Sequence, residues 1–371
     1  MLLRLKMPLI LAVFLFSAFL MQVPSPARAD SNVQWIKYSG NPILGPTLSG
    51  WDSEFALAPT VLFDGSTYRM WYVGGNATAV AIGYANSTDG FTWRKYPDPV
   101  LSPGSAGSWD SSAVGLGSVI WNGTLFLMWY RGGNSMTFAN GAVGLAFSRD
   151  GISWSKYSAN PVLTVTTAIT PITIVGRVCV IRWQATYYMW ASGRSASDQI
   201  SNHTRIYYAT SNNGVNWTIG PSAAISPSTN ATAWDSQIVY GPSVIQAGSN
   251  FGLWYSGISQ GSHNPQIGYA NSQDLVTWTK DPGNPILSEG SSDSWDAGGV
   301  EQPVIIFGAN GYALYYDGFN ATSHAKIGLA LPPQNFKVPE LPIPEIGLLA
   351  LVLAAVVVFH IHRRRKRIEP D

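Results

Sequence analysis

The body of the chain alternates short apolar runs with polar turns. In the first clear stretch the runs cover residues 58–63, 67–73, 79–85 and 91–96. Asp64-Gly65 and Thr88-Asp89-Gly90 separate some of them, and both residue types tolerate the positive φ that tight hairpins demand. β-Branched and aromatic residues dominate the runs, whereas no apolar period of about 3.6 residues is sustained. The pattern predicts an all-β body built from four-stranded units.

One segment repeats five times along the chain. It is an aromatic pair (Trp-Ala in one case), one further residue and Gly. The copies are Trp71–Gly74, Trp129–Gly132, Trp190–Gly193, Trp254–Gly257 and Tyr315–Gly318. Their starts lie about 60 residues apart, which suits a four-stranded propeller blade. The repeat therefore predicts a five-bladed β-propeller.

Other motifs recur in four of the five units. Turns of the type Ser-x-Asp-Gly-x-x-Trp cover 87–93, 148–154, 211–217 and 272–278, and Trp-Asp pairs begin at Trp51, Trp109, Trp234 and Trp295. Asn-Pro-Ile/Val-Leu begins at Asn41, Asn160 and Asn284, with Asp98-Pro99-Val100-Leu101 as a variant. A residue that recurs belongs first to the scaffold. We therefore interpret the repeated Asp residues as turn or cap residues and most of the 15 Trp as core between blades.

The motifs also indicate how the ring closes. There are five aromatic strands but four Trp-ended turns, so the last unit lacks a strand. Trp35 and Tyr38 precede Asn41-Pro42-Ile43-Leu44, the ending that follows the turns elsewhere. We expect the N-terminal strand to complete the last blade, which removes two open sheet edges.

The amino-acid composition argues against some classes of binding partner. Charged residues make up 12% and the net charge is +1, which argues against nucleic acid, since that partner needs a basic face. Cys179 is the single cysteine and stands between valines, so it reads as a buried thiol. No zinc, phosphate-loop or Ser-His-Asp motif is visible, and we predict no cofactor or metal. Glycosylation sequons at Asn76, Asn86, Asn122, Asn202, Asn216, Asn230 and Asn320 fit a secreted surface, although polar turns give the same count.

Both ends of the chain carry membrane signals. A basic start, an apolar run and Ala27-Arg28-Ala29 predict a cleaved signal peptide over 1–29, with an uncleaved anchor as the alternative. The propeller is expected over 30–335 and a Pro-rich linker over 336–345. Residues 346–362 are expected to span the membrane and 363–371 to form a basic cytoplasmic tail, a core helix being the alternative. The body would then lie on the extracellular face, held by one C-terminal anchor.

The C-terminal segment shows a resemblance of its own. Pro342-Ile343-Pro344-Glu345, the apolar span and the Arg-rich end together resemble the sorting tails handled by exosortases and archaeosortases. The resemblance implies a sortase-like processing enzyme as a partner and exchange of the helix for another anchor.

The body resembles the five-bladed glycosidase propellers of glycoside hydrolase families 43 and 32 and their relatives. Ser272-Gln273-Asp274-Leu275-Val276-Thr277-Trp278 is the closest motif, and the likeness covers nearly the whole mature body. The resemblance implies a carbohydrate ligand and glycoside hydrolysis. Family 43 places acids on the inner strands of its first three blades, whereas this chain has Leu57-Ala58, Gly115-Leu116 and Gly176-Arg177 there. The family's usual triad is therefore not visible.

Candidate site residues are those that break the repeat near the start of each inner strand. Hydrolysis needs two carboxyl groups across the scissile bond, and Glu301 and Asp317 are the best pair, with Glu54 as a third candidate. Arg131, Arg177, Tyr240 and Gln302 are predicted to bind substrate. An alternative pairs Glu301 with Arg177 as a structural salt bridge. Arg194, His203, Arg205, His263 and His324 also break the repeat.

Three functions stay open on the sequence. The first is a surface-anchored glycosidase-like protein that acts on extracellular glycan. The second is a non-catalytic propeller that binds glycan or protein in the same funnel. The third is a structural protein of the cell envelope, which predicts a funnel mouth without acids.

Overall fold

The computed structural model describes residues 34–136, 138, 141–164, 173–321 and 323–333. These residues contain twenty strands and one short helix. They form units of four strands, numbered along the chain. The first unit holds β2 (Phe55–Phe63), β3 (Tyr68–Gly75), β4 (Val80–Ser87) and β5 (Arg94–Lys95), and the second holds β6 (Ala113–Trp121), β7 (Phe126–Gly133), β8 (Ala142–Ser148) and β9 (Trp154–Lys156). The third holds β10 (Thr173–Trp183), β11 (Thr186–Arg194), β12 (Arg205–Ser211) and β13 (Thr218–Ile225). The fourth holds β14 (Ile238–Ala247), β15 (Asn250–Ile258), β16 (Gln266–Ser272) and β17 (Thr279–Lys280), and the fifth holds β18 (Gly299–Gly308), β19 (Gly311–Asn320), β20 (Ser323–Leu331) and β1 (Ile36–Lys37).

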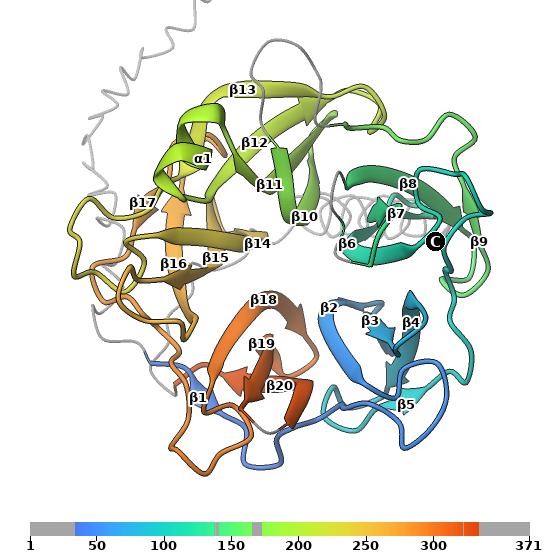
Figure 1. Ribbon diagram of the computed structural model, residues 1–371, viewed down its shortest axis with the longest axis horizontal. Helices are drawn as coiled ribbons and strands as arrows, with labels where there is room; N and C mark the ends of the chain where they lie inside the picture. Colours follow the sequence, from blue (N-terminus) through green and yellow to red (C-terminus); the bar gives the residue numbers. More distant parts are fainter. Residues whose placement is uncertain (1–33, 137, 139–140, 165–172, 322, 334–371) are drawn as a thin grey trace, which may run out of the picture.

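Neighbouring strands within each unit are antiparallel, and in the first four units they follow the chain order. The third, fourth and fifth units are separate four-stranded sheets. The first two are joined by one parallel pair, Val80 with Ala113, into an eight-stranded sheet. The first strands of the units, β2, β6, β10, β14 and β18, contact one another in a ring about the centre (Figure 1). The predicted all-β, propeller-like architecture is confirmed.

The N-terminal strand completes the last sheet. β1 pairs with β20 through Ile36 with Leu331 and Lys37 with Ala330, which gives the order β1-β20-β19-β18. Lys37 Nζ also forms an ion pair of 2.6 Å with Asp296 in the same unit. The strand that the motif count assigned to the last unit is therefore found there.

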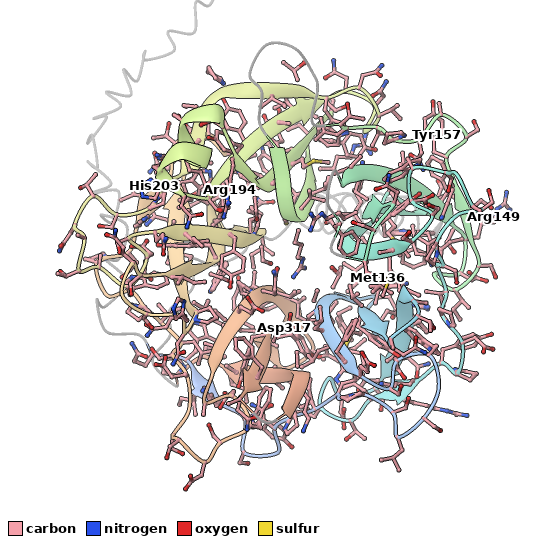
Figure 2. The ribbon with its side chains drawn as sticks, viewed as in Figure 1. Met136, Arg149, Tyr157, Arg194, His203 and Asp317 are labelled. Atoms are coloured by element: carbon pink, nitrogen blue, oxygen red, sulfur yellow. The ribbon has the colours of Figure 1, made fainter. Side chains whose placement is uncertain are left out.

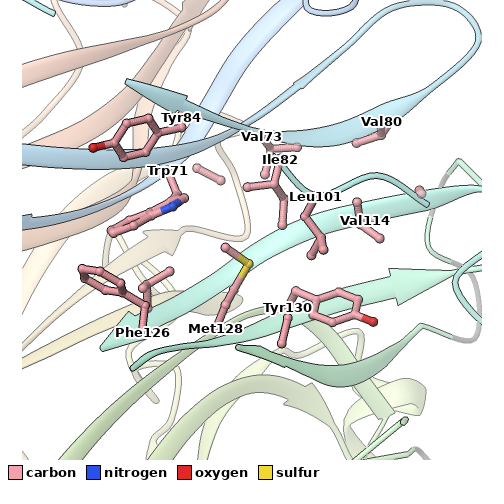
Figure 3. Packing of buried hydrophobic residues seen from close by; sticks show 14 residues of the cluster. Trp71, Val73, Val80, Ile82, Tyr84, Leu101, Val114, Phe126, Met128 and Tyr130 are labelled. Atoms are coloured by element: carbon pink, nitrogen blue, oxygen red, sulfur yellow. The ribbon is translucent and has the colours of Figure 1, made fainter. Parts of the chain in front are cut away.

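The first aromatic residue of each repeated pair packs between neighbouring units. Trp71 from β3 lies in a buried cluster with Phe126 and Met128 of the second unit (Figure 3). The corresponding residues Trp129, Trp190, Trp254 and Tyr315 lie in four similar clusters at the other junctions. Burial of such large side chains stabilises each junction by about 2 kcal/mol or more per residue. The tryptophans that recur in register are thus core residues.

The second aromatic residue holds the Trp-Asp turn. Tyr72 Oη donates to Asp52 at 2.9 Å, and Lys95 forms an ion pair with the same carboxylate. Asp110, Asp235 and Asp296 each have an equivalent Tyr and an equivalent Lys partner in their own unit. A side chain at Gly74 would meet the Cβ of Asp52 at 2.6 Å, which explains the Gly of the repeat. These aspartates are scaffold residues, as their repetition indicated.

The third unit departs from this pattern through α1 (Ala196–Ser201). It has Ala191 in place of the second aromatic residue, and Asp198 of α1 accepts from Tyr207 Oη and pairs with Arg205, both at 2.6 Å. Ser195 caps the helix in a reciprocal pair with Asp198. A six-residue helix cannot sustain an apolar period, so the pattern of apolar positions did not predict it.

The predicted signal peptide and the segments after 335 lie outside the described residues. Within the described part, no helix is long and apolar enough to cross a membrane.

Candidate functional site

A cavity of about 410 Å³ lies where the inner strands meet. Each unit contributes to its wall, through Ala58 of β2, Gly115 of β6, Arg177 of β10, Tyr240 of β14 and Gln302 of β18. These are the positions at which the sequence placed the start of each inner strand. A cavity of this size is typical of a small-molecule binding site.

A β-bulge in each inner strand directs these side chains. The pairing register shifts between Leu57 and Thr60 and at the corresponding place in the other four inner strands. Ala58, Gly241 and Gln302 have positive φ at the bulge, of 51°, 61° and 53°. Bulges re-aim side chains and strain non-glycine residues, which is common beside functional sites.

The backbone N–H of the bulge is capped from the preceding unit at three junctions. Gly241 N–H donates to Ser192 Oγ at 3.0 Å, and Gln302 N–H donates to Ser256 Oγ at 2.9 Å. The equivalent cap at the junction of the fifth and first units is the carboxylate of Asp317, which accepts from Ala58 N–H. Its place in this series gives Asp317 a structural role beside any chemical one.

Glu301 and Asp317 face each other across β18 and β19. They are register partners, and Asp317 accepts the N–H of Ala58 with both oxygens, at 2.8 and 2.7 Å. Glu301 Oε2 accepts from Tyr240 Oη. Loss of solvation raises the pKa of both carboxyl groups, that of Asp317 well above its usual value with a further rise from the charge of Glu301. Asp317 is 1% exposed, whereas Glu301 is partly exposed.

The three predicted catalytic carboxyl groups are not among the residues that line the cavity. Glu301 and Asp317 lie behind it as neighbours in one sheet, in contact with Tyr240 and Ala58 of the wall. Glu54 precedes β2, where its N–H donates to Gly75 O at 3.0 Å. The structure therefore places the pair side by side rather than on two sides of the cavity.

Arg177 lines the cavity and reaches residues of other units. Its guanidinium donates to Gly117 O at 3.1 Å, to Gln302 O at 3.3 Å and to Thr60 Oγ1 at 3.1 Å, so it joins four units. The side chain is 7% exposed, and burial lowers its pKa. No ion pair between Arg177 and Glu301 forms among the described residues, so the alternative salt bridge is not found.

Two buried polar atoms of the wall have no hydrogen-bond partner among the described residues, Arg131 Nε and Gln302 Oε1. Arg131 Nη2 donates to Phe138 O at 3.1 Å, and its guanidinium lies 4.7 Å from the centre of the Phe138 ring. Burial lowers the pKa of Arg131 to about 10. An unpartnered buried donor and acceptor each cost about 1–3 kcal/mol unless a ligand satisfies them.

The four predicted substrate-binding residues, Arg131, Arg177, Tyr240 and Gln302, all line the cavity; their roles in binding stay a prediction. Arg194 and Phe138 line it as well and were not among them. Arg194 broke the repeat and lies between α1 and β14 (Figure 2), so the same signal pointed to it. Phe138 lies between β7 and β8, outside the repeated motifs, and had no such signal. Among the described residues no cluster of three His, Cys, Asp or Glu could hold a metal ion.

Several known proteins are similar to this chain in sequence or in fold. No family model matches the sequence. Two uncharacterized proteins of Mycobacterium tuberculosis are each 26% identical over 295 residues, which covers 75% of this chain and 92% of theirs. The fold is similar to that of BT0996 in an RGII complex, with a TM-score of 0.65, 18% identity and coverage of 84% of this protein and 96% of that one.

Two further structures share the fold. A study of the GH130 family of mannoside phosphorylases and of glycoside hydrolases that target β-1,2 mannosidic linkages in Candida mannan supplies one, with a TM-score of 0.62, 17% identity and coverage of 86% and 98%. A thermostable family-43 glycoside hydrolase supplies the other, with a TM-score of 0.61, 19% identity and coverage of 76% and 91%. The chain thus has the fold of glycoside hydrolase-like propeller proteins.

Proposed function

We propose that this protein is a glycosidase-like propeller that binds a glycan in the central cavity. The observation that carries the proposal is the pair of unpartnered polar atoms in its wall, Arg131 Nε and Gln302 Oε1. A sugar hydroxyl both donates and accepts hydrogen bonds, so one sugar ring can satisfy both atoms. Aromatic and aliphatic wall residues such as Phe138 and Leu57 suit the apolar face of the ring.

The shared fold supports a carbohydrate ligand. Similar structures carry the names of glycoside hydrolases, and one of them is an RGII complex. A fold alone does not assign an activity, so the argument for this chain rests on its own cavity.

Hydrolysis is the catalytic form of the proposal, with Glu301 and Asp317 as acid and base. Tyr240 is the member of this hydrogen-bonded group that reaches the cavity, so it would relay a proton between Glu301 and the glycosidic oxygen. Burial raises the pKa of Glu301, which favours the protonated form that a proton donor needs.

Binding without turnover is the second candidate. It is favoured by the finding that no carboxylate is among the residues that line the cavity. Catalytic glycosidases ordinarily bring two carboxyl groups to the bond that breaks.

One experiment separates these forms. The full chain is incubated with a panel of aryl glycosides, and binding is scored in parallel on a glycan array. Turnover that falls at least about 100-fold in both Glu301→Gln and Tyr240→Phe supports the catalytic form. The exposed Asp293→Asn serves as the matched control. Binding without turnover supports the second candidate, and neither binding nor turnover overturns the proposal.

The proposal includes the wider organisation of the chain. Each four-stranded unit is interpreted as one blade, which gives five blades when the eight-stranded sheet is counted as two. The signal peptide, the C-terminal helix and the sorting-like tail would hold the propeller on the extracellular face of the membrane. Fractionation of cells that express the chain with and without residues 346–371 tests this part, because the shorter chain should leave the membrane fraction.

A further inference from the structure

The wall of the cavity carries positive charge, of which Asp317, behind the wall, offsets part through its attraction to Arg177. Three guanidinium groups line it, from Arg131 on β7, Arg177 on β10 and Arg194 on β11, and no Asp or Glu is among the lining residues. The six ion pairs of the described residues include none of the three. Arg131 comes from the second unit and Arg177 and Arg194 from the third, and the guanidinium of Arg177 reaches across to the first and fifth units.

The three arginines differ in what holds them. Arg177 is fixed by three neutral acceptors. Arg194 donates from Nε to Thr204 Oγ1 at 2.9 Å. Arg131 keeps its Nε buried and unpartnered while its guanidinium stacks on Phe138. Among the described residues Arg131 and Arg194 thus donate one hydrogen bond each, whereas Arg177 donates three.

A buried guanidinium without a counter-charge is unstable relative to one that is paired. Burial is the cause of the lowered pKa of Arg131, and no acidic group opposes it. A planar carboxylate matches the fork of an arginine and restores both charge balance and hydrogen bonds.

The neighbouring acidic residues do not prevent a carboxylate from binding to the arginines. Glu301 and Asp317 lie behind Tyr240 and Ala58, and the pKa of each is raised by burial. The raised pKa values favour the uncharged forms, and neither group is among the residues that line the cavity.

We infer that the cavity binds a carboxylate-bearing sugar, a uronic acid unit of a glycan, with its carboxylate on Arg131 and Arg194 and a hydroxyl on Gln302 Oε1. The inference rests on the proposed function and names its substrate class. A free phosphate or other small anion would also pair with the arginines, but it would fill little of a cavity of about 410 Å³. A sugar acid satisfies both sides of the cavity at once.

Matched sugar pairs test the inference. Methyl glycosides of glucuronate, galacturonate and mannuronate are titrated calorimetrically into the full chain beside those of glucose, galactose and mannose. At least one acid should bind about tenfold or more tightly than its neutral partner and than its own methyl ester. Its affinity should fall with rising salt concentration, because the interaction is ionic.

Variants connect the preference to the named residues. Arg131→Gln should remove the preference for the acid, so that the acid and its neutral partner bind with similar affinity. Arg131→Lys keeps the charge without the fork and should retain part of it. Arg149→Gln is the matched control, because Arg149 is exposed at the outer edge of the ring (Figure 2). A thermal unfolding curve for each variant shows that the fold is retained.

Four results decide the matter. Acid preference that depends on Arg131 supports the inference. Equal or tighter binding of neutral sugars overturns it and leaves the proposed function standing. Inorganic phosphate that binds through Arg131, with no sugar acid bound, overturns it in favour of a plain anion site. The absence of binding by any sugar overturns the inference together with the proposed function.

Discussion

Asp317 accepts the backbone N–H of Ala58 through both carboxylate oxygens, at 2.8 and 2.7 Å, although the two residues are 259 positions apart. Ser192 and Ser256 cap the bulges of the next units in the same way. A carboxyl group therefore stands where the first and last units of the ring meet, in a place that hydroxyl groups occupy at two other junctions. Asp317 connects the closure of the fold with the chemistry of the cavity.

The cap predicts a graded series of variants at Asp317. Asp317→Ala leaves the buried N–H of Ala58 unpartnered and should lower the free energy of unfolding by about 1–3 kcal/mol. Asp317→Ser copies the caps of the other junctions and should recover much of this loss. Urea unfolding measures both, and equal stability of the Ala and Ser variants would contradict the role as a cap.

The pH dependence of stability follows from the direction of the shift. The pKa of Asp317 is raised well above 3.8, first by burial and then by the charge of Glu301. Its protonated form therefore stabilises the fold, fully below about pH 3.8, and this contribution is lost as pH rises through the raised pKa.

Asp317→Asn removes this titration. The free energy of unfolding of the natural chain minus that of the variant should fall as pH rises from about 4 to 8. Other aspartates, such as Asp150 with a pKa of about 2, are common to both proteins and cancel in the difference. Parallel curves for the two proteins over this range would show that Asp317 keeps an ordinary pKa.

Arg177 should matter more for stability than an arginine of the surface. Arg177→Met removes the N–H groups that donate to Gly117 O, Gln302 O and Thr60 Oγ1. This variant should lower the free energy of unfolding by about 3 kcal/mol. Arg149→Met is exposed and should change it by less than about 0.5 kcal/mol. Similar unfolding midpoints for the two variants would contradict the bridging role of Arg177.

Gln302 should show opposite effects on stability and on binding. Its Oε1 is buried without a partner, which costs free energy in the empty cavity. Gln302→Met should therefore raise the free energy of unfolding by about 1 kcal/mol and weaken glycan binding about tenfold. Thermal unfolding and calorimetry measure the two effects. A variant that is less stable and binds glycan normally would show that Oε1 faces no ligand.

Much of the fold followed from the sequence because its signals are local. Hairpin turns need Gly or Asp at fixed offsets, as at Asp89 and Gly90, and Asp89 accepts the N–H groups of Phe91 and Thr92 in the turn. The repeat of aromatic pairs located the strands and their junctions. The missing strand of the last unit followed from counting motifs, and β1 fills it.

The candidate site could be predicted from the sequence only in part. Breaks in the repeat pointed to Arg131, Arg177, Tyr240 and Gln302, which the structure brings together around one cavity. The same reasoning placed Glu301 and Asp317 across a ligand, whereas they lie behind the wall as cross-strand neighbours.

The sequence by itself determined the repeating unit, the scaffold role of the recurring aspartates and tryptophans, and the strand that closes the ring. These properties depend on contacts within a unit or on a pattern that each unit repeats. Only the tertiary structure decided which polar side chains reach the cavity. The bulge in each inner strand breaks the alternation of side chains, so that Gln302 lines the cavity while Glu301, its neighbour, turns to Tyr240. Partners for Asp317 and Arg177 come from other units, and the packing of the ring brings those units together.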